Sequence, residues 1–423
     1  MLDLRRIRED PGPARDALAR RGAAEDLDRL LELDGRRREL IPRIEELRAK
    51  QNQANDAIAA AKRAGEDADE LIAQMREVAA EAKGLGAELT EVESARDELA
   101  ATLPNIPSPR APDGETDEDA VVLREVGERP SFSFAARDHL ELAAAHGWIG
   151  MEKAAEASGS RFAYLMGDLV LVELALIRLA VDVVRGEGFE PVVPPVLVRE
   201  GPLFGTGFFP GERDQIYAIE RDELYLVGTS EVSLAALHAG DILDSEELPR
   251  RYAGISTCFR RESGAAGKDT RGIFRVHQFD KVEMFSFVRP DQADAEHERL
   301  LEIEERILAA LEIPYRVVDI PIGELGAPAA RKFDCEGWFP GQERYRELTS
   351  CSDTTDYQAR RLDARFRPEP EASPEHLNTL NGTAIAVPRT LIALLENGQR
   401  EDGSIELPKA LAEAGAPAVL PAS

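Results

Sequence analysis

The sequence predicts an α+β fold: a mostly antiparallel sheet with flanking helices, preceded by an antiparallel two-helix coiled coil. Two observations predict it. An apolar heptad repeat runs through residues 27–101, and beyond a proline-rich segment the chain changes to short, closely spaced runs of Val, Ile, Phe and Tyr. With 423 residues, 43% of them hydrophobic, the chain is long enough for two domains with a sizeable core.

The first predicted element is a pair of long helices. Apolar residues recur at alternating spacings of four and three, which is the heptad pattern of a coiled coil. The repeat positions are Leu40, Ile44, Leu47, Gln51, Ala54, Ile58 and Ala61 in the first helix and Leu71, Met75, Val78, Ala82, Leu85, Leu89, Val92, Arg96 and Leu99 in the second. Gln51 and Arg96 are the polar interruptions of this seam. Only Gly65 and its acidic neighbours separate the two runs. We therefore expect an antiparallel hairpin with arms of roughly 50 Å, at about 1.5 Å per residue, and a kink or local break at Pro42.

The charge of the chain bears on nucleic-acid binding. A formal net charge of -28 argues against such a partner for the molecule as a whole, because phosphate contacts need local positive charge. Residues 34–63, however, contain eight basic and five acidic residues, whereas residues 66–99 contain three basic and eleven acidic ones. One helix face could therefore meet RNA. The periodicity alone leaves a dimerisation coiled coil open as the alternative.

Four prolines mark a linker at residues 104–114. This divides the chain into a helical domain at 1–103, with long arms at 27–101, and a second domain at 115–412, followed by a tail at 413–423 that we expect to be disordered. Helical patterns in the second domain cover roughly 167–185, 290–311 and 389–397. The expected strands are 191–198, 215–219, 223–228, 252–259, 273–287, 315–320 and 380–387.

Several features exclude a secreted or membrane protein. The first ten residues lack the apolar core of a signal peptide. The most apolar stretch, residues 165–184, carries four charged side chains, too many for a membrane span. Cys258, Cys335 and Cys351 have neither metal-ligand spacing nor an even-numbered disulfide pattern. We therefore expect a cytoplasmic protein with structural thiols, no zinc and no membrane contact.

The most informative segment begins as Phe-Arg-Arg-Glu at 259–262 and continues, after a Gly/Ala-rich gap, as Phe-Arg-Val-His-Gln-Phe-Asp-Lys-Val-Glu at 274–283. It reads as two strands joined by a loop that can close. Two arginines beside such a loop suit a polyphosphate. Phe279 offers a face on which a base could stack, and Glu283 suits a small polar or cationic group.

This segment resembles motif 2 of class II aminoacyl-tRNA synthetases, in the form found in seryl-tRNA synthetases. The resemblance extends over nearly the whole chain and implies the class II antiparallel sheet and the ATP-dependent charging of tRNA with serine. It assigns Arg260 to the ATP α-phosphate and the substrate carboxylate, where it would stabilise charge developing at phosphorus. The further ATP contacts that it implies are Arg261, Glu262, which orients the nucleotide, Val276, which lines the adenine pocket, and Phe279, which stacks on adenine. In the joining loop, Lys268 and Arg271 are expected to touch phosphates or the tRNA end.

Two segments upstream add to the resemblance. Residues 188–195, which follow a long helix, resemble motif 1, the element that builds the dimer interface in the family, so a homodimer is expected. Thr229, Ser230 and Glu231 resemble the Thr-Xaa-Glu element that contacts the amino acid, with Ser230 where many members carry alanine. The resemblance also assigns Glu283 a contact with bound serine.

Residues 346–353 and 356–361 resemble the family's Glu-(Ile/Val)-Ser-Ser-Cys-Ser element and its Asp-(Phe/Tyr)-Gln-Ala-Arg-Arg continuation. The resemblance assigns four consecutive residues of the first element to ATP binding: Glu347, Leu348, Thr349 and Ser350. Glu347 and Ser350 are hard oxygen donors, which suit a Mg²⁺ ion that bridges ATP phosphates.

Residues 379–389 resemble motif 3. The resemblance implies that Arg389 clamps the γ-phosphate, as the second catalytic cation, and that the hydroxyl of Thr383 helps to recognise serine. Pro388 departs from the family's usual glycine or threonine before the arginine. Proline is acceptable at a first helical position, where the N–H would be unpaired in any case.

The partners that the resemblance implies are serine, ATP with Mg²⁺, tRNA(Ser) gripped by the helical hairpin and, as it further suggests, tRNA(Sec). The sequence leaves two alternatives. A ligase of the same fold could charge a carrier protein or serve a secondary pathway, but such relatives lack the hairpin. A non-catalytic coiled-coil RNA-binding protein could retain a dead core, but Arg260, Glu283, Glu347 and Arg389 are intact.

Overall fold

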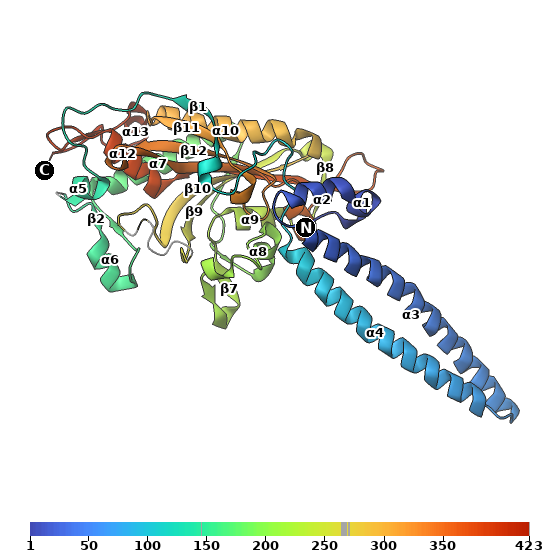
Figure 1. Cartoon of the computed structure of the whole chain (residues 1–423). Coiled ribbons are helices and arrows are strands. Elements are labelled where there is room, and N and C mark those ends of the chain that lie inside the picture. The colour runs from blue at the N-terminus through green and yellow to red at the C-terminus, as the bar shows by residue number, and fades with distance from the viewer. Residues whose placement is uncertain (145, 264–268, 270, 423) are drawn as a thin grey trace. The chain divides into compact units, whose positions relative to one another are not determined.

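The chain folds into two compact units. The computed structural model describes residues 1–144, 146–263, 269 and 271–422. One unit is the helical unit (residues 2–103), and the other is the sheet unit (residues 104–423 together with Met1). Figure 1 labels the elements of both units.

The helical unit is dominated by two long antiparallel helices. Its elements are α1 (Leu4–Glu9), α2 (Pro11–Ala19), α3 (Ala24–Ala64) and α4 (Asp69–Thr102). The chain reverses between the long helices at Gly65, which ends α3 in the left-handed conformation at φ 74°, where glycine carries no steric cost. The predicted heptad residues are the buried or half-buried positions of the arms, while most residues between them are exposed. The predicted hairpin and its seam are confirmed.

The predicted local break at Pro42 is wrong, because α3 continues through this residue without interruption. Proline in a helix interior removes one backbone hydrogen bond and costs about 3 kcal/mol. The seam of α3 against α4 offsets this cost over many turns. Three ion pairs between the two helices also stabilise the hairpin: Arg36 with Glu88 at 2.6 Å, Arg37 with Glu93 at 2.8 Å and Arg43 with Glu81 at 2.9 Å.

The sheet unit is built on a large sheet that is antiparallel except for its last pair, β9 with β4. In spatial order its strands are β1 (Val121–Val126), β11 (Tyr315–Asp319), β12 (Arg331–Phe339), β13 (Arg344–Asp353), β16 (Asn378–Ala386), β10 (Gln278–Val288), β9 (Arg250–Phe259) and β4 (Glu190–Val192). Three helices pack on one face and enclose the main apolar core: α7 (Asp168–Gly186), α10 (Ala293–Ala310) and α12 (Val387–Asn397). The α+β fold is therefore confirmed (Figure 1).

Smaller elements surround this sheet. The helices are α5 (His139–Ala144), α6 (Met151–Ser158), α8 (Glu200–Thr206), α9 (Glu231–Ala235), α11 (Tyr357–Leu362) and α13 (Lys409–Glu413). The short strands are β2 (Ile149–Gly150), β3 (Tyr164–Leu165), β5 (Leu197–Val198), β6 (Ala218–Ile219), β7 (Leu224–Leu226), β8 (Ile242–Asp244), β14 (Arg365–Arg367), β15 (Glu375–His376), β17 (Ile405–Glu406) and β18 (Val419–Leu420).

Two regions differ from the sequence-based expectation. The tail is ordered where the structure describes it, because β18 pairs with β17 and buries Leu420 completely. Residues 104–114, which we expected to form a linker, belong to the sheet unit and pack against it. There the buried amide of Asn105 donates hydrogen bonds to the carbonyl oxygens of Pro328 and Thr354 at 2.8 and 2.9 Å. Long-range pairing thus overrides a local composition that is typical of a linker or a tail.

In the part of the chain that the structure describes, we find no helix that is both long and apolar enough to cross a membrane. The cysteines Cys258, Cys335 and Cys351 are free and buried, as expected of structural thiols.

Candidate active site

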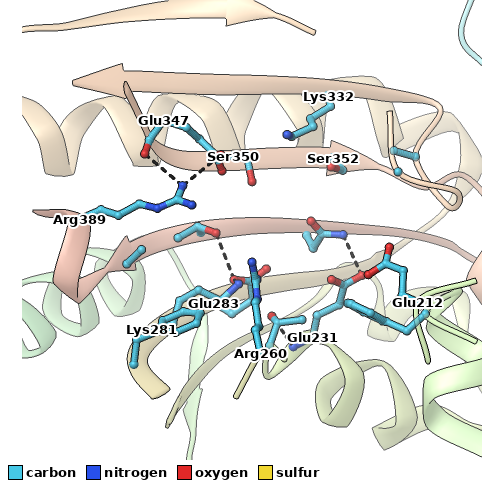
Figure 2. Close-up of a pocket in the computed structure, with 18 of the residues that line it drawn as sticks. Glu212, Glu231, Arg260, Lys281, Glu283, Lys332, Glu347, Ser350, Ser352 and Arg389 are labelled. Atoms are coloured by element: carbon cyan, nitrogen blue, oxygen red, sulfur yellow. Dashed lines mark hydrogen bonds and ion pairs between the residues drawn. The ribbon is translucent and has the colours of Figure 1, made fainter. Parts of the chain in front are cut away.

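A cavity of about 370 Å³ opens on the sheet unit, and it is lined mainly by β10, β13 and β16 together with segments around α8 and α9. Twelve of the predicted site residues line it: Thr229, Glu231, Arg260, Glu262, Val276, Phe279, Glu283, Glu347, Leu348, Ser350, Thr383 and Arg389. Figure 2 shows charged members of this set that converge from segments distant in sequence: Glu231, Arg260, Glu283, Glu347 and Arg389.

Alternation along the strands positions the side chains of β10 and β16. Side chains two residues apart point to the same face of a strand. Phe279 and Glu283 of β10 therefore reach the cavity together, with Lys281 between them, and Asn381 and Thr383 of β16 do the same.

A β-bulge brings Glu347 and Ser350 to the same side of β13. Residues three apart on a regular strand face opposite ways, so both could not line one cavity. The register of β12 with β13 shifts at this point, since Cys335 pairs with Thr349 and Glu336 pairs with Glu347. The extra residue, Leu348, restores the common orientation.

One end of the cavity is acidic. Glu231 accepts hydrogen bonds from Gln358 at 2.7 Å and from Asn381 at 3.0 Å, and Thr383 donates one to Glu283 at 3.3 Å. Lys281 forms an ion pair with Glu283. Burial, followed by repulsion from Glu283, raises the pKa of Glu231 to about 7. This end can hold a small ligand that carries a positive charge and a hydroxyl group.

The other end is rich in cations. Arg389, at the start of α12, lies 3.0 Å from the carboxylate of Glu347 and also donates to its carbonyl oxygen at 3.2 Å (Figure 2). The Glu347 side chain lies deep in the cavity yet keeps 41% of its surface exposed. Burial would raise the pKa of Glu347, but Arg389 and Lys332 outweigh it and lower that pKa to about 2. This end suits a polyphosphate.

Arg260 joins the two ends. Its Nε donates to the carbonyl oxygen of Gly228 at 3.0 Å, and its guanidinium carbon lies 5.3 Å from the ring centre of Phe279. Arg260 lines the cavity together with Glu212, which lies beside Glu231 in Figure 2. The positive charge of Arg260 helps to lower the pKa of Glu347 and opposes the rise that burial causes in the pKa of Glu212. Among the described residues, the hydrogen bond of Arg260 uses its Nε–H alone, so its terminal nitrogens can bind a ligand.

The segment between β9 and β10 carries further charged lining residues. Glu262 has a positive φ of 50°, and its carboxylate accepts a hydrogen bond from Arg275 at 3.3 Å. Arg275 also bonds to Asp269 at 3.2 Å. Residues 264–268 and 270 lie outside the described residues, and the expected contact of Lys268 falls among them.

Three predicted site residues do not line the cavity. Ser230 is fully buried, and its hydroxyl lies 3.4 Å from the carbonyl oxygen of Gly254. A Cβ atom added to Gly254 would lie only 2.6 Å from this hydroxyl oxygen, so the two residues pack closely. The Nε of Arg261 donates to the carbonyl oxygen of Ile216 at 3.2 Å. Thr349 lies on the opposite face of β13 and donates to Glu304 of α10 at 2.7 Å.

Several cavity residues were missed from the sequence: Glu212, Phe274, Arg275, Lys281, Lys332, Ser352 and Asn381. Lys281 and Asn381 precede Glu283 and Thr383 by two residues, so strand alternation could have found them. The others depend on contacts that are distant in sequence. Phe274, for example, lies beneath the guanidinium carbon of Arg389 at 4.7 Å.

The oxygen donors expected to hold a metal, Glu347 and Ser350, line the same cavity. Carboxylate and hydroxyl oxygens suit a hard cation such as Mg²⁺. Within the residues that the structure describes, no group of three or more His, Cys, Asp and Glu side chains forms a metal-ligand cluster.

Comparisons with known proteins agree with this geometry. Residues 216–398 match the tRNA synthetase class II core domain (G, H, P, S and T), and residues 1–107 match the seryl-tRNA synthetase N-terminal domain. The fold and the cavity thus define a class II aminoacyl-tRNA synthetase. Such an ATP-dependent enzyme implies a divalent metal that accompanies ATP.

Individual relatives narrow the assignment. A serine–tRNA ligase of Acidothermus cellulolyticus is 51% identical and one of Rubrobacter xylanophilus is 48% identical, each over 412 residues and 97% of both chains. The crystal structure of seryl-tRNA synthetase from Pyrococcus horikoshii complexed with ATP matches with a TM-score of 0.92, 40% identity and 100% of both chains covered. The chain belongs to the seryl-tRNA synthetase family of ATP-dependent ligases. Neither a carrier-charging ligase nor a non-catalytic protein is favoured, because the match spans both units.

Proposed function

We propose that the protein activates serine with ATP and transfers it to the 3′ end of tRNA(Ser). One observation carries the proposal: a single cavity joins a cationic end to an acidic end, with Arg260 between them. The name of the Pyrococcus horikoshii structure, which states a complex with ATP, supports the nucleotide. The names of the bacterial relatives support serine and tRNA.

In this proposal ATP occupies the cationic end. Phe279 stacks on adenine, Val276 lines the same pocket and Glu262 orients the base. Arg389 holds the γ-phosphate. Its guanidinium group lies 3.0 Å from the carboxylate of Glu347, so it must turn away from that carboxylate to reach the phosphate. Glu347 and Ser350 would hold the Mg²⁺ ion, which supplies neutralising charge to the phosphates when bound.

Serine occupies the acidic end. Thr229 and Glu231 receive its ammonium group, while Glu283 and Thr383 bond its hydroxyl. A pocket that is built to bond a hydroxyl rejects alanine, because its own buried polar groups would be left unpaired. The hydrogen bond between Thr383 and Glu283, 3.3 Å long, supports such a hydroxyl site.

The chemistry needs no protein nucleophile. A carboxylate oxygen of serine attacks the α-phosphorus of ATP in line, forming an O–P bond as the bond to pyrophosphate breaks. A terminal ribose hydroxyl of tRNA then attacks the acyl carbon, and AMP leaves. Arg260 holds the carboxylate and the α-phosphate in contact and stabilises the developing charge, so positioning and electrostatics supply the acceleration.

The macromolecular partners follow from the same proposal. The helical unit binds tRNA(Ser) by shape and backbone, and tRNA(Sec) is proposed as a second substrate. The exposed apolar side chains of Leu171 and Leu174 on α7 and of Val193 just after β4 support a homodimer. We place the reaction in the cytoplasm, where thiols such as those of the three buried cysteines stay reduced.

Aminoacylation of total tRNA with each of the twenty amino acids in turn tests the proposal. We expect charging with serine alone, dependent on ATP. Charging with another amino acid, or none with serine, would refute it. Pyrophosphate exchange that depends on serine but leads to no tRNA charging would instead favour a different acceptor.

A further inference from the structure

The segment at 356–361, which the proposed chemistry leaves without a role, forms most of α11 beside the acidic end of the cavity. Its Gln358 is fully buried, and both ends of the amide have partners. The Nε2 group donates to Glu231 at 2.7 Å and to the carbonyl oxygen of Thr206 at 3.2 Å. The Oε1 atom accepts a bond from Thr379 at 2.8 Å.

These partners fix the orientation of the amide. A carboxylate and a carbonyl can only accept, so the Nε2 group must face Glu231 and Thr206. A hydroxyl can donate, so Oε1 faces Thr379. Behind it, the hydroxyls of Thr354 and Thr379 lie 2.6 Å apart, and the Thr354 hydroxyl also donates to the carbonyl oxygen of Thr379 at 2.7 Å. The result is two consecutive directed bonds, from Thr379 to Gln358 and from Gln358 to the Glu231 carboxylate, in which the first bond polarises the second.

We propose that Gln358 is a positioning residue for serine binding, which fixes the Glu231 carboxylate in place and in its charged form. The inference rests on the proposed function, in which Glu231 receives the ammonium group of serine. Gln358 does not line the cavity, so it acts through Glu231.

The surroundings of Glu231 explain why such support is needed. Burial and the charges of Glu283 and Glu212 favour the protonated acid, whereas Lys281 and the bond from Gln358 favour the carboxylate. Asn381 contributes a second donor at 3.0 Å. With the pKa of Glu231 at about 7, serine binding weakens as pH falls through neutrality, because the protonated acid cannot pair with an ammonium group. Loss of the Gln358 bond raises this pKa further, so the weakening begins at a higher pH.

Gln358→Met in the full-length protein tests the inference, because methionine has a similar length and no amide. Because the lost hydrogen bond goes to a charged group, we expect the KM for serine in pyrophosphate exchange to rise about tenfold or more. The KM for ATP should stay within about twofold. In a pH series, the rise in serine KM on acidification should begin at a higher pH than in the wild type.

Gln399→Met is the matched control. Gln399 is also a buried amide, bonded to Arg137 and Glu396, and it does not line the cavity. It should lower thermal stability to a similar extent without moving the serine KM or its pH profile. Thr379→Val leaves Gln358 in place but removes the hydroxyl that donates to it. This variant should shift the serine KM and its pH profile in the same direction as Gln358→Met, by a smaller amount. If Gln358→Met does not fold, Thr379→Val tests the inference in its place.

Equal rises in both KM values, or a serine KM and pH profile like those of Gln399→Met, would overturn the inference. The proposed function would survive that result, provided that the wild type exchanges pyrophosphate with serine. Absence of exchange in the wild type would instead refute the proposed function itself.

Discussion

An ion pair between the long helices and one between β9 and α10 of the sheet unit have the same chemistry but different surroundings. Between α3 and α4, the side chains of Arg43 and Glu81 are 45% and 47% exposed. Between β9 and α10, the side chains of Arg251 and Glu296 are 21% and 4% exposed. Two hydrogen bonds, of 2.7 and 2.6 Å, join this pair. Exposed pairs contribute about 0–1 kcal/mol, whereas breaking a buried pair costs about 3–5 kcal/mol.

On α3, basic side chains that pair with α4 must be distinguished from basic side chains that can contact a partner. Three arginines of α3 pair with α4, which cancels part of the positive charge expected to face RNA. Arg38, Arg48 and Lys62 are exposed and form no ion pair within the described part of the chain. In the sheet unit, by contrast, a cavity gathers charged side chains such as Arg260, Glu231 and Arg389, where they can act together on one ligand.

The largest effect should follow from Arg260→Ala. Arg260 is the cation that joins the two ends of the cavity, so its loss should lower serine-dependent pyrophosphate exchange by about 10³-fold. Arg261→Ala is the matched control, because Arg261 does not line the cavity. A near-normal exchange rate in Arg260→Ala, with the fold intact by circular dichroism, would refute the assignment.

Deletion of residues 30–100 separates the two units functionally. We expect exchange to continue, because the cavity residues all lie in the sheet unit. Charging of tRNA should fall by about 10²-fold or more, since phosphate contacts dominate affinity for nucleic acids. The exchange assay itself reports that the sheet unit has folded. Undiminished charging would mean that the hairpin serves another purpose, such as dimerisation.

Glu296→Ala should be much more costly to stability than Glu88→Ala. Removal of Glu296 leaves Arg251 without its carboxylate and deprives Ser286 of an acceptor at 2.7 Å, so we expect a loss of about 3–5 kcal/mol in the free energy of unfolding. Glu88 is 39% exposed opposite Arg36, and its loss should cost less than about 1 kcal/mol. Urea denaturation measures both. Similar losses in the two variants would contradict the comparison.

The smallest effect is expected from the free charges of α3. The triple variant R38A/R48A/K62A should raise the KM for tRNA by about tenfold and flatten its dependence on salt, because fewer phosphates are neutralised. Pyrophosphate exchange should not change. A triple variant of the paired arginines, R36A/R37A/R43A, is the control and should affect tRNA less. The reverse order would show that the paired arginines face the RNA.

Local pattern was enough to predict the two long helices of the helical unit, because their heptads pair residues that the spacing alone identifies. It predicted neither α1 and α2 nor the continuity of α3 through Pro42. The sheet unit was predicted less completely. The strands β12 and β13 were missed because polar side chains such as Lys332 and Ser352 face the cavity and interrupt the apolar pattern. The common orientation of Glu347 and Ser350 depends on a bulge, and the support of Glu231 depends on Gln358, 127 residues away. Neither the bulge nor this hydrogen bond can be recognised from the spacing of residues along the sequence.

A structure with a non-hydrolysable analogue of seryl-adenylate tests the central claim most directly. We expect the adenine against Phe279, the phosphate beside Arg260 and the serine hydroxyl between Glu283 and Thr383. Density for the analogue elsewhere, or none at saturating concentration, would contradict the account.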